Sequence, residues 1–402
     1  MVKIFKGMKL ITCAKDAVIE DALIIVDRGK IVRVGQSGST EVPSDAAVVD
    51  LEGKTILPGF IDAHIHCMMD ASGDPVSVLE DEHPAITVLK ALQNLQRTLH
   101  AGITHVRDLG GKDYLELGLR QAGEEALIQI PRMKAAGKII TMTGGHCCAI
   151  GREADGLDEI RKAAREQMKA GADLIKVMAT GGVISRGVEP GSPQLCLEEI
   201  SAAVEEAHKA GKKVAAHAQG TVGIKNAVLA GVDSVEHGIY LDEETIDLMV
   251  QNDVVLVPTL SAPYWVIEAG VEKGVPAFVV EKSSITIKSH YPSFRAAREA
   301  NVKIAMGTDA GTPFNEHGKN LYELKLMVEQ GMTPLEAITA ATRASAELLG
   351  IERDFGSIAE GKVADMVVLS GDPLENIEAV FEVEAVYREG VRVAGGPSGG
   401  AN

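Results

Sequence analysis

The stretch that decides the fold is PGFIDAHIH, residues 58–66, an apolar run that ends in a pair of histidines. Alternation along an extended strand turns His64 and His66 to the same side, so both imidazoles reach one space at the end of this strand. Imidazole nitrogen is a preferred ligand of Zn²⁺ and of neighbouring transition metals. The motif therefore predicts a strand whose carboxyl end carries two metal ligands.

Downstream of this motif, short β-branched runs alternate with amphipathic stretches, a pattern typical of βα units around a parallel sheet. Strands are expected at 56–66, 103–108, 133–141, 173–179, 213–217, 233–237, 254–258 and 302–309. The expected helices between them include 85–100, 158–170, 197–210, 221–229, 242–251 and 285–300. The predicted fold class is α/β, a (β/α)8 TIM barrel, with a doubly wound open sheet as the alternative.

The two ends of the chain have a different sequence pattern from the middle. Short strands separated by turn signals are expected at 8–12, 22–27, 30–35 and 47–51, and again at 364–369, 385–388 and 390–393. Two β-rich ends around a different middle predict one small β-sandwich domain built from both termini, residues 1–56 and 358–402. The barrel domain is then expected to span residues 57–357.

Composition limits the partners and the compartment. The chain has 402 residues, and 40 Lys plus Arg against 57 Asp plus Glu give a formal net charge of −17. Such a surface is repelled by phosphate backbones and anionic lipids, so we expect neither a nucleic-acid nor a membrane partner. Lys and Gly within MVKIFKG, residues 1–7, come too early for a secretory signal, and the five cysteines include no Cys-x-x-Cys pair. We therefore expect a cytoplasmic protein.

Further polar residues occur at the ends of later predicted strands, namely His217, His237 and Asp309. One buried histidine alone is usually a core residue with a satisfied hydrogen bond. Several histidines and an aspartate at the carboxyl ends of parallel strands indicate a metal site instead. Lys176 lies in the apolar run LIKVMA, where burial lowers the pKa of its amine and frees the lone pair for reaction; a paired or surface lysine is the alternative.

With these residues in this order, the sequence resembles the amidohydrolase superfamily over nearly its whole length. In binuclear members, the corresponding lysine reacts with CO2 to form a carbamate that bridges two metal ions. The resemblance implies two divalent metal ions, with Zn²⁺ expected and Mn²⁺, Co²⁺ or Fe²⁺ as alternatives. It implies that the more buried ion binds His64, His66 and Asp309. The second ion then binds His217 and His237, and carboxylated Lys176 joins both.

Two shorter motifs resemble the prolidase-like branch of dipeptidases and carboxypeptidases, GGH at 144–146 and HGIY at 237–240. In that branch the corresponding histidine and tyrosine contact the scissile carbonyl or the tetrahedral intermediate, which implies catalytic roles for His146 and Tyr240. A plain turn and a packing tyrosine are the alternatives. Residues 218–220, AQG, lack the His-x-x-Glu arrangement of mononuclear deaminases, which disfavours deamination.

The implied activity is hydrolysis of the amide bond to a C-terminal amino acid, in an L-Xaa-L-Pro type dipeptide or an N-acyl amino acid. A metal-bridging hydroxide attacks the carbonyl, and Asp309 passes the proton to the leaving nitrogen. The alternatives are a cyclic-amide hydrolase or lactonase of the same superfamily and a non-catalytic scaffold. We also expect a small-molecule substrate and a homo-oligomer.

Three other features are assigned less directly from the sequence. Arg186 is a candidate partner for a substrate carboxylate, with a solvated loop arginine as the alternative. Cys147 and Cys148 are interpreted as small packing residues, because metal-activated water needs no thiol nucleophile. Tyr264 and Trp265 either wall the pocket or pack, and the sequence does not choose between the two.

Overall fold

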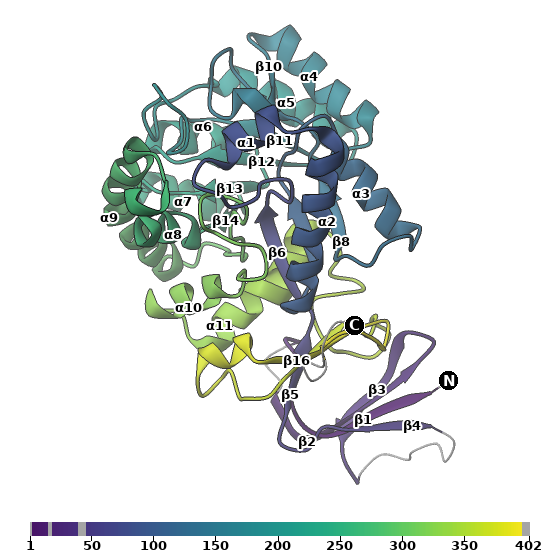
Figure 1. The fold of residues 1–402 in the computed structure, drawn as a ribbon. Coiled ribbons are helices and arrows are strands. Elements are labelled where there is room, and N and C mark those ends of the chain that lie inside the picture. Colours follow the sequence, from purple (N-terminus) through teal and green to yellow (C-terminus); the bar gives the residue numbers. More distant parts are fainter. Residues whose placement is uncertain (1, 15–17, 39–45, 396–402) are drawn as a thin grey trace.

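The computed structural model describes residues 2–14, 18–38 and 46–395. Figure 1 shows a large body of strands and helices above a smaller sheet that contains the first strands of the chain. The arrow of β6 (Phe60–Ile65) points away from that smaller sheet. The carboxyl end of β6 therefore lies within the body, on the side away from the terminal strands.

The terminal strands form one eight-stranded mixed sheet in the order β17-β16-β15-β5-β1-β2-β3, with β4 paired to β1. Its members are β1 (Lys3–Ile11), β2 (Val18–Asp27), β3 (Lys30–Gln36), β4 (Ala47–Asp50), β5 (Thr55–Pro58), β15 (Met366–Leu369), β16 (Val383–Arg388) and β17 (Val391–Ala394). Strand β5 joins the two ends of the chain, because it pairs with β1 on one side and with β15 on the other. The part of the predicted terminal domain after residue 395 lies outside the described residues.

This terminal sheet curls strongly. Phe5 in β1 and Tyr387 in β16 are three strand positions apart in the sheet order, which would be about 14 Å in a flat sheet. Their ring centroids lie only 5.0 Å apart, at an interplanar angle of 84°. Strands β1 and β16 therefore face each other around a shared apolar core that includes Met8, Ile24 and Met366.

The strands of the body are parallel throughout and fall into a six-stranded and a three-stranded sheet. The first has the order β10-β9-β11-β12-β13-β14 and the second the order β6-β7-β8. Their bounds are β7 (Ile103–Asp108), β8 (Arg132–Ala135), β9 (Ile139–Thr141), β10 (Gly151–Glu153), β11 (Leu174–Met178), β12 (Lys213–Ala218), β13 (Ser234–His237) and β14 (Val255–Val257).

The segment 302–310 lies between β14 and β6 but forms only isolated bridges, Leu256 to Ile304 and Ile65 to Ala310. A regular strand was expected here. The ladder is irregular because the Met306 N–H donates to the Ala340 carbonyl, and because the Thr308 N–H is shared between the His64 carbonyl at 3.2 Å and the Asp62 carboxylate at 3.1 Å. On the other side of the body, Asp173 N–H donates to Ala135 O at 2.8 Å, which links β8 to the start of β11.

Two other expected strands are each divided in two. The expected strand 56–66 is β5 in the terminal sheet followed by β6 in the body, and Gly59 lies between them. A Cβ at Gly59 would lie 2.3 Å from the Thr104 hydroxyl, so only glycine fits this crossing. The expected strand 133–141 is β8 and β9, separated at Gly137, whose φ of +74° breaks the extended conformation.

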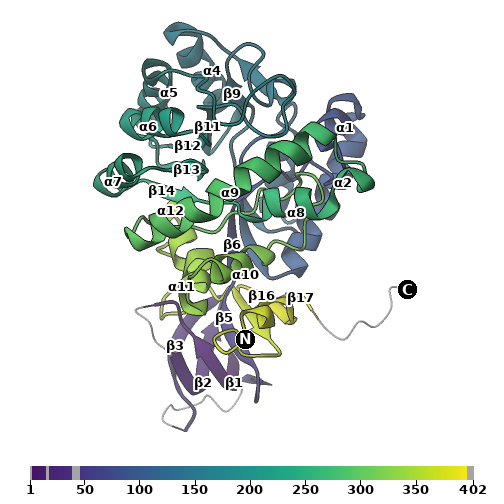
Figure 2. The ribbon, with the colours of Figure 1, turned by 90° about the vertical axis from the view of Figure 1, so that its left-hand side faces the viewer.

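Helices follow most strands of the body. Their bounds are α1 (Pro75–Asp81), α2 (Pro84–His100), α3 (Leu115–Glu124), α4 (Leu157–Ala170), α5 (Leu197–Lys209), α6 (Thr221–Ala230), α7 (Glu243–Gln251), α8 (Ser261–Ala269), α9 (Ala277–Glu299), α10 (Tyr322–Glu329), α11 (Pro334–Thr339) and α12 (Ser345–Leu349). The expected helix 285–300 covers only the last two thirds of α9, which begins at Ala277 and crosses the face of the body in Figure 2. Helix α4 ends at Ala170, and Gly171 follows it as a left-handed C-cap with a φ of 102°.

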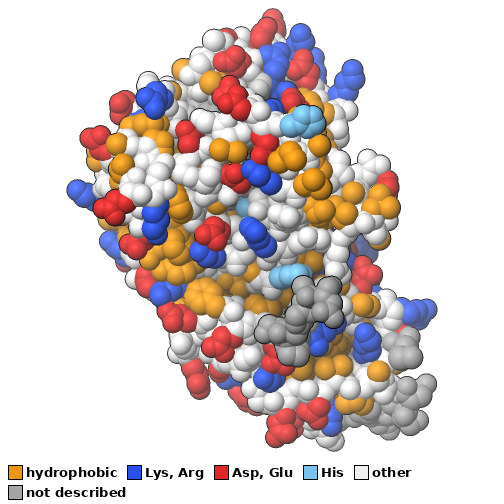
Figure 3. Space-filling view, in the orientation of Figure 1, with side chains coloured by type: hydrophobic (Ala, Val, Ile, Leu, Met, Phe, Trp, Pro, Cys, Tyr) orange, Lys and Arg blue, Asp and Glu red, His pale blue; other side chains and the backbone are white. Residues whose placement is uncertain are grey.

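None of the helices in the described ranges combines the length and the apolar character that a membrane span requires. Acidic and basic side chains are interspersed over the face shown in Figure 3, and neither sign gathers into one patch there.

Candidate active site

The carboxyl end of β6 brings together three side chains that could hold a metal ion. His64, His66 and Asp309 each offer one ligand atom, and these atoms all lie within 4.8 Å of one another. Asp309 Oδ1 is 3.3 Å from His64 Nε2 and 3.4 Å from His66 Nε2. The two histidines share one face of the strand, as the alternation in the sequence predicts, and Asp309 arrives from the segment after β14.

Hydrogen bonds at the far side of each ring fix which nitrogen faces the cavity. His64 Nδ1 lies 2.8 Å from Glu236 Oε2, and His66 Nδ1 lies 2.9 Å from the Gly110 carbonyl oxygen. Carboxylate and carbonyl oxygens only accept, so each Nδ1 carries the hydrogen and each Nε2 keeps its lone pair. Both imidazoles are therefore oriented as metal ligands through Nε2.

The histidines of β12 and β13 are fixed in the same way. His237 Nδ1 lies 2.7 Å from Thr259 Oγ1, whose own hydroxyl donates to the Pro258 carbonyl, so the histidine nitrogen is the donor. His217 differs, because its Nε2 lies 3.4 Å from the Gly181 carbonyl and its Nδ1 is the free nitrogen. Burial lowers the pKa of His217 and of His237 well below the usual value, which keeps both rings neutral.

Lys176 points its amine into the same space from β11. The residue is 1% exposed, and its Nζ has no hydrogen-bond partner among the described residues. Burial lowers the pKa of Lys176 to about 8, although the carboxylates of Glu236 and Asp309 oppose this shift. A buried amine without a partner is costly, so an additional group at Nζ would complete the local bonding.

Asp309 carries the negative charge of the cluster. Burial alone would raise its pKa, but His64, His66 and Lys176 surround the carboxylate and lower the pKa below the usual value. Its backbone has a φ of +60°, in the left-handed region that few non-glycine residues adopt. The carboxylate is therefore ionised at neutral pH and held by an unusual turn.

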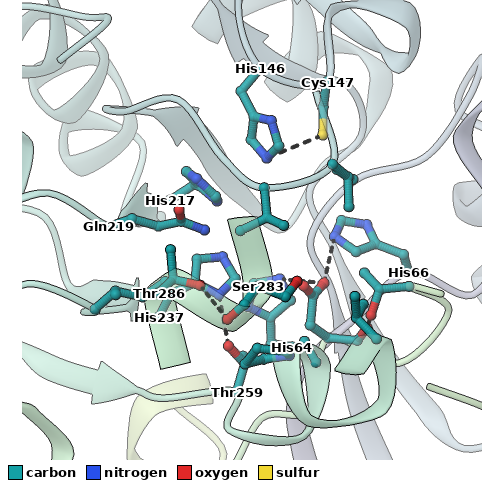
Figure 4. A pocket seen from close by; sticks show the side chains of 18 of the residues that line it. His64, His66, His146, Cys147, His217, Gln219, His237, Thr259, Ser283 and Thr286 are labelled. Carbon is teal, nitrogen blue, oxygen red and sulfur yellow. Dashed lines mark hydrogen bonds and ion pairs between the residues drawn. The ribbon is translucent and has the colours of Figure 1, made fainter. Parts of the chain in front are cut away.

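All six predicted metal ligands line one cavity of about 690 Å³, together with His146. Figure 4 shows the five histidine rings turned toward this common space from different elements. Neighbouring ring centroids lie 4.4 Å apart for His146 and His217, 4.5 Å for His217 and His237, and 5.2 Å for His64 and His237. Side chains from strand ends that are far apart in the sequence therefore meet at this one cavity.

His146 lies on the opposite wall from β6 and is 4% exposed. Its Nδ1 lies 2.7 Å from Ser185 Oγ, and burial lowers the pKa of His146 to about 3. Gly182 makes this position possible, because a Cβ there would lie 2.3 Å from His146 Nε2. A neutral His146 with the Ser185 hydroxyl donating to Nδ1 presents an Nε2–H donor to the cavity.

Tyr240 is placed differently from the other predicted site residues. It is half-buried after β13, where its N–H donates to the Gln219 carbonyl at 2.8 Å, and it is not among the described residues that line the cavity. Arg186 is exposed, and its guanidinium lies 5.0 Å from the centre of the Phe278 ring, also away from the cavity wall. The structure therefore brings neither residue into contact with the histidine cluster.

The aromatic and thiol side chains near the site have packing roles. The Tyr264 hydroxyl lies 2.8 Å from that of Tyr322, and Trp265 packs against the same pair of rings. Cys147 lines the cavity, but burial raises the pKa of its thiol to about 12. A protonated thiol is a weak nucleophile, which agrees with the interpretation of Cys147 as a packing residue.

Sequence reasoning missed several residues of the cavity wall. Polar members are Gln219, Thr259, Ser283, Thr286, His290 and Thr312, and apolar members include Met69, Met178, Val183, Ile184, Ile239, Pro263 and Val266. Gln219 Oε1 and Ser283 Oγ are buried without a partner among the described residues. Only Gln219 had a local signal, since it follows β12 two residues after His217; Ser283 lies in α9 with no motif around it.

Comparison with known proteins places this geometry in a family. Residues 55–393 match the model of the amidohydrolase family. A crystal structure of a Xaa-Pro dipeptidase with bound methionine superimposes with a TM-score of 0.92 at 35% identity, over 98% of this chain and 100% of the other. A prolidase crystallised with N-methylphosphonate-L-proline gives a TM-score of 0.91 at 32% identity, over 98% and 99% of the two chains.

A curated relative agrees with the structural neighbours. Ochratoxinase from Aspergillus niger is 33% identical over 363 residues, which cover 82% of this chain and 73% of the relative. The resemblance of the PGFIDAHIH motif and of the later strand-end residues is thereby confirmed at the level of the family. This chain belongs to the amidohydrolase family, and it is a hydrolase.

Proposed function

We propose that the protein hydrolyses the amide bond to a C-terminal amino acid, in L-Xaa-L-Pro type dipeptides or N-acyl amino acids, with two divalent metal ions, expected to be Zn²⁺. The observation that carries the proposal is the convergence of His64, His66, Lys176, His217, His237 and Asp309 on one cavity. The similarity to a Xaa-Pro dipeptidase and to a prolidase supports the substrate class.

The side chains fit a pair of metal ions. His64, His66 and Asp309 supply a compact donor set for one ion, and His217 and His237 supply neutral imidazoles for a second. The unpartnered amine of Lys176, with its lowered pKa, suits reaction with CO2 to a carbamate, in which the nitrogen attacks carbon and loses a proton. The resulting carboxylate-like oxygens would join the two ions.

In this proposal, Asp309 transfers the proton and His146 stabilises the developing negative charge. The chemistry supplied by divalent ions held here is Lewis acidity, which lowers the pKa of water and polarises a carbonyl. Asp309 accepts the proton of the attacking water and returns it to the departing nitrogen, because an amide anion is a poor leaving group. His146 donates from Nε2 to the developing oxyanion, a role worth about 2.7–4 kcal/mol for a well-placed donor.

Tyr240 is proposed as a third residue that contacts the substrate, on the resemblance of the HGIY motif at 237–240 to the prolidase-like branch. Both polar atoms of the Tyr240 backbone are hydrogen-bonded. Its N–H donates to the Gln219 carbonyl at 2.8 Å, and its carbonyl accepts from the Thr221 hydroxyl at 2.6 Å. A Tyr240→Phe variant should raise KM or lower kcat if the hydroxyl meets the substrate. If KM and kcat are both unchanged, the Tyr240 hydroxyl does not contact the substrate and the residue has only a packing role.

The experiment that tests this function is a substrate screen on protein of measured metal content. L-Xaa-L-Pro dipeptides and N-acyl amino acids are compared with hydantoins and lactones as kcat/KM. We expect the two amide classes to give the highest values, and Asp309→Asn protein purified in parallel serves as the control for contaminating hydrolases. Turnover of hydantoins or lactones with no cleavage of either amide class would overturn the proposal.

We also infer a closed eight-stranded barrel over residues 57–357 and a two-layer β-sandwich built from 1–56 and 358–402. The bridges of segment 302–310 to β14 and β6, and the bond from Asp173 to Ala135, support the barrel. The short distance between Phe5 and Tyr387 supports two facing layers. A homo-oligomer and a cytoplasmic location stay predictions, which light scattering and cell fractionation test.

A further inference from the structure

Asp62 is a buried carboxylate in β6, two residues before His64. The side chain is 0% exposed, and it is not among the described residues that line the active-site cavity. Neither the proposed metal site nor the proposed proton transfer uses it. A buried charge outside the chemistry is costly unless hydrogen bonds compensate it, so the contacts of Asp62 show what the residue does in the fold.

Four hydrogen bonds reach the Asp62 carboxylate. Oδ1 accepts from the His64 N–H at 3.1 Å and from the Thr308 N–H at 3.1 Å. Oδ2 accepts from the Thr308 hydroxyl at 2.7 Å and from Asn320 Nδ2 at 2.7 Å. Both oxygens therefore act only as acceptors, as the oxygens of an ionised carboxylate do.

Further hydrogen bonds fix the direction of the two side-chain donors. Asn320 Oδ1 accepts from the Gly318 N–H at 2.9 Å, so the amide nitrogen of Asn320 must face Asp62. Thr308 Oγ1 accepts from the Ala310 N–H at 3.0 Å, which leaves the hydroxyl hydrogen for Asp62. This arrangement needs an acceptor at both oxygens of residue 62.

Asp62 links the strand that carries His64 to the segment that carries Asp309. The pairing of β6 with β7 shifts between Asp62 and Ile65, and at this irregularity the Asp62 carboxylate accepts the His64 N–H. On the other side, Thr308 directly precedes Asp309, and the Asp309 N–H donates to the His64 carbonyl at 2.7 Å. Asp62 therefore holds the backbone of His64 and the residue before Asp309 in one hydrogen-bonded unit.

This unit decides where two proposed ligand atoms meet. Asp309 Oδ1 lies 3.3 Å from His64 Nε2, and the φ of Asp309 is +60°. A residue in the left-handed region keeps that conformation when the surrounding structure fixes it. Among the described residues, the four hydrogen bonds of Asp62 include none to His217 or His237, which are proposed to hold the second ion.

We propose that Asp62 is a positioning residue, which fixes Asp309 relative to His64 and so shapes the binding site of the ion that these two residues are proposed to hold. This inference rests on the proposed metal site. Loss of the carboxylate should weaken the binding of that ion selectively, and it should lower kcat because Asp309 is the proposed base. KM should change little, since Asp62 does not line the cavity.

Asp62→Asn keeps the shape of the side chain and removes one acceptor. In either orientation of the new amide, its nitrogen meets two donors, the pair at Oδ1 or the pair at Oδ2. Metal-stripped full-length protein is titrated calorimetrically with Zn²⁺ in the presence of bicarbonate. We expect one of two binding events to weaken about 10–100-fold, the range typical for partners of metal ligands, and the other to weaken less.

Asp365→Asn is the matched control for loss of stability alone. Asp365 is a carboxylate of 6% exposure just before β15, where it pairs with Arg132 and accepts from the Glu389 N–H at 2.8 Å. We expect both aspartate variants to lower the melting temperature, and only Asp62→Asn to change Zn²⁺ binding and kcat. Wild-type Zn²⁺ binding and kcat in Asp62→Asn would overturn the positioning role, as would equal weakening of both binding events.

A milder variant keeps the test available if Asp62→Asn does not fold. Asn320→Ala removes one of the four donors to Asp62 and leaves the carboxylate in place. We expect the same binding event to weaken by roughly threefold, because three donors still hold the carboxylate. Wild-type Zn²⁺ binding in folded Asn320→Ala protein, with Asp62→Asn unfolded, would also overturn the proposal.

The Zn²⁺ titration separates this inference from the proposed activity, because it needs no substrate. Selective weakening of one binding event in Asp62→Asn supports the positioning role even if the wild-type protein cleaves neither dipeptides nor N-acyl amino acids. The absence of two binding events in the wild-type protein would overturn the proposed metal site and this inference together.

Discussion

Glu236 accepts a hydrogen bond of 2.8 Å from Nδ1 of His64, and both side chains are at most 1% exposed. The other oxygen of Glu236 accepts from Arg107 Nη2 at 2.9 Å. Burial alone would raise the pKa of Glu236, but Arg107 and His64 lower it to about 2. Glu236 is therefore a carboxylate at any working pH, and it holds His64 with Nε2 toward the cavity.

Replacement of Glu236 by glutamine should weaken this orientation without changing the side-chain volume. We expect the Glu236→Gln variant to lose about 10–100-fold in metal affinity or in kcat/KM, as is typical for partners of metal-binding histidines. Metal titration with a chromogenic chelator and steady-state kinetics measure the two quantities. Wild-type metal affinity together with wild-type kcat/KM would show that Glu236 has no positioning role.

Loss of Lys176 should remove the group that we propose joins two metal ions. We expect Lys176→Ala protein to retain less metal than wild type, and added short carboxylates to restore part of the activity. The matched control is Lys213→Ala on the neighbouring strand, whose ammonium contacts the Glu347 carbonyl outside the cavity. Elemental analysis measures the metal content of both variants. Full metal content together with full activity in Lys176→Ala would refute a bridging carbamate.

Asp309→Asn removes the proposed base but keeps the shape of the side chain. We expect kcat to fall by about 10²–10⁴-fold, the range that a positioned proton-transfer group supplies. The control is Asp70→Asn, an aspartate near the same end of β6 that pairs with Lys90 at 3.1 Å. Near wild-type kcat in Asp309→Asn, with metal content verified, would assign proton transfer to another group.

The pKa of Lys176 predicts a pH dependence for reactivation of metal-stripped protein. CO2 reacts with the neutral amine, and a pKa of about 8 makes this form scarce below pH 8 and dominant above it. At fixed CO2 pressure, the initial reactivation rate should rise roughly 25-fold between about pH 6.5 and about pH 8.5, the ratio of neutral amine fractions. A rate that is flat or falls over this range would contradict carboxylation of Lys176.

The sequence predicts the strand-end residues because each lies at the end of an apolar run. His64, Lys176 and His237 occupy buried strands whose carboxyl ends open on one cavity, as parallel βα units require. Their partners are not readable in the same way. Glu236 contacts His64 across 172 sequence positions, and only the folded chain shows which carboxylate meets which ring.

The differences between expectation and structure have local causes. Gly137 divides the third expected strand through its positive φ, and in the eighth the Asp62 side chain shares the Thr308 N–H with the His64 carbonyl. Tyr240 is the last residue of the HGIY motif, and the chain turns within the motif at Gly238, whose φ is 61°. Tyr240 is not among the residues that line the cavity. The motif gives the residue types, whereas the backbone conformation within it decides where the last side chain lies.

The most direct test of the central claim is a titration of metal-stripped protein with Zn²⁺ in the presence of bicarbonate, followed by hydrolysis of an L-Xaa-L-Pro dipeptide or an N-acyl amino acid. The account predicts that activity rises to a plateau at two equivalents of Zn²⁺ per chain. Full hydrolytic activity of protein that contains no divalent metal ion would contradict it.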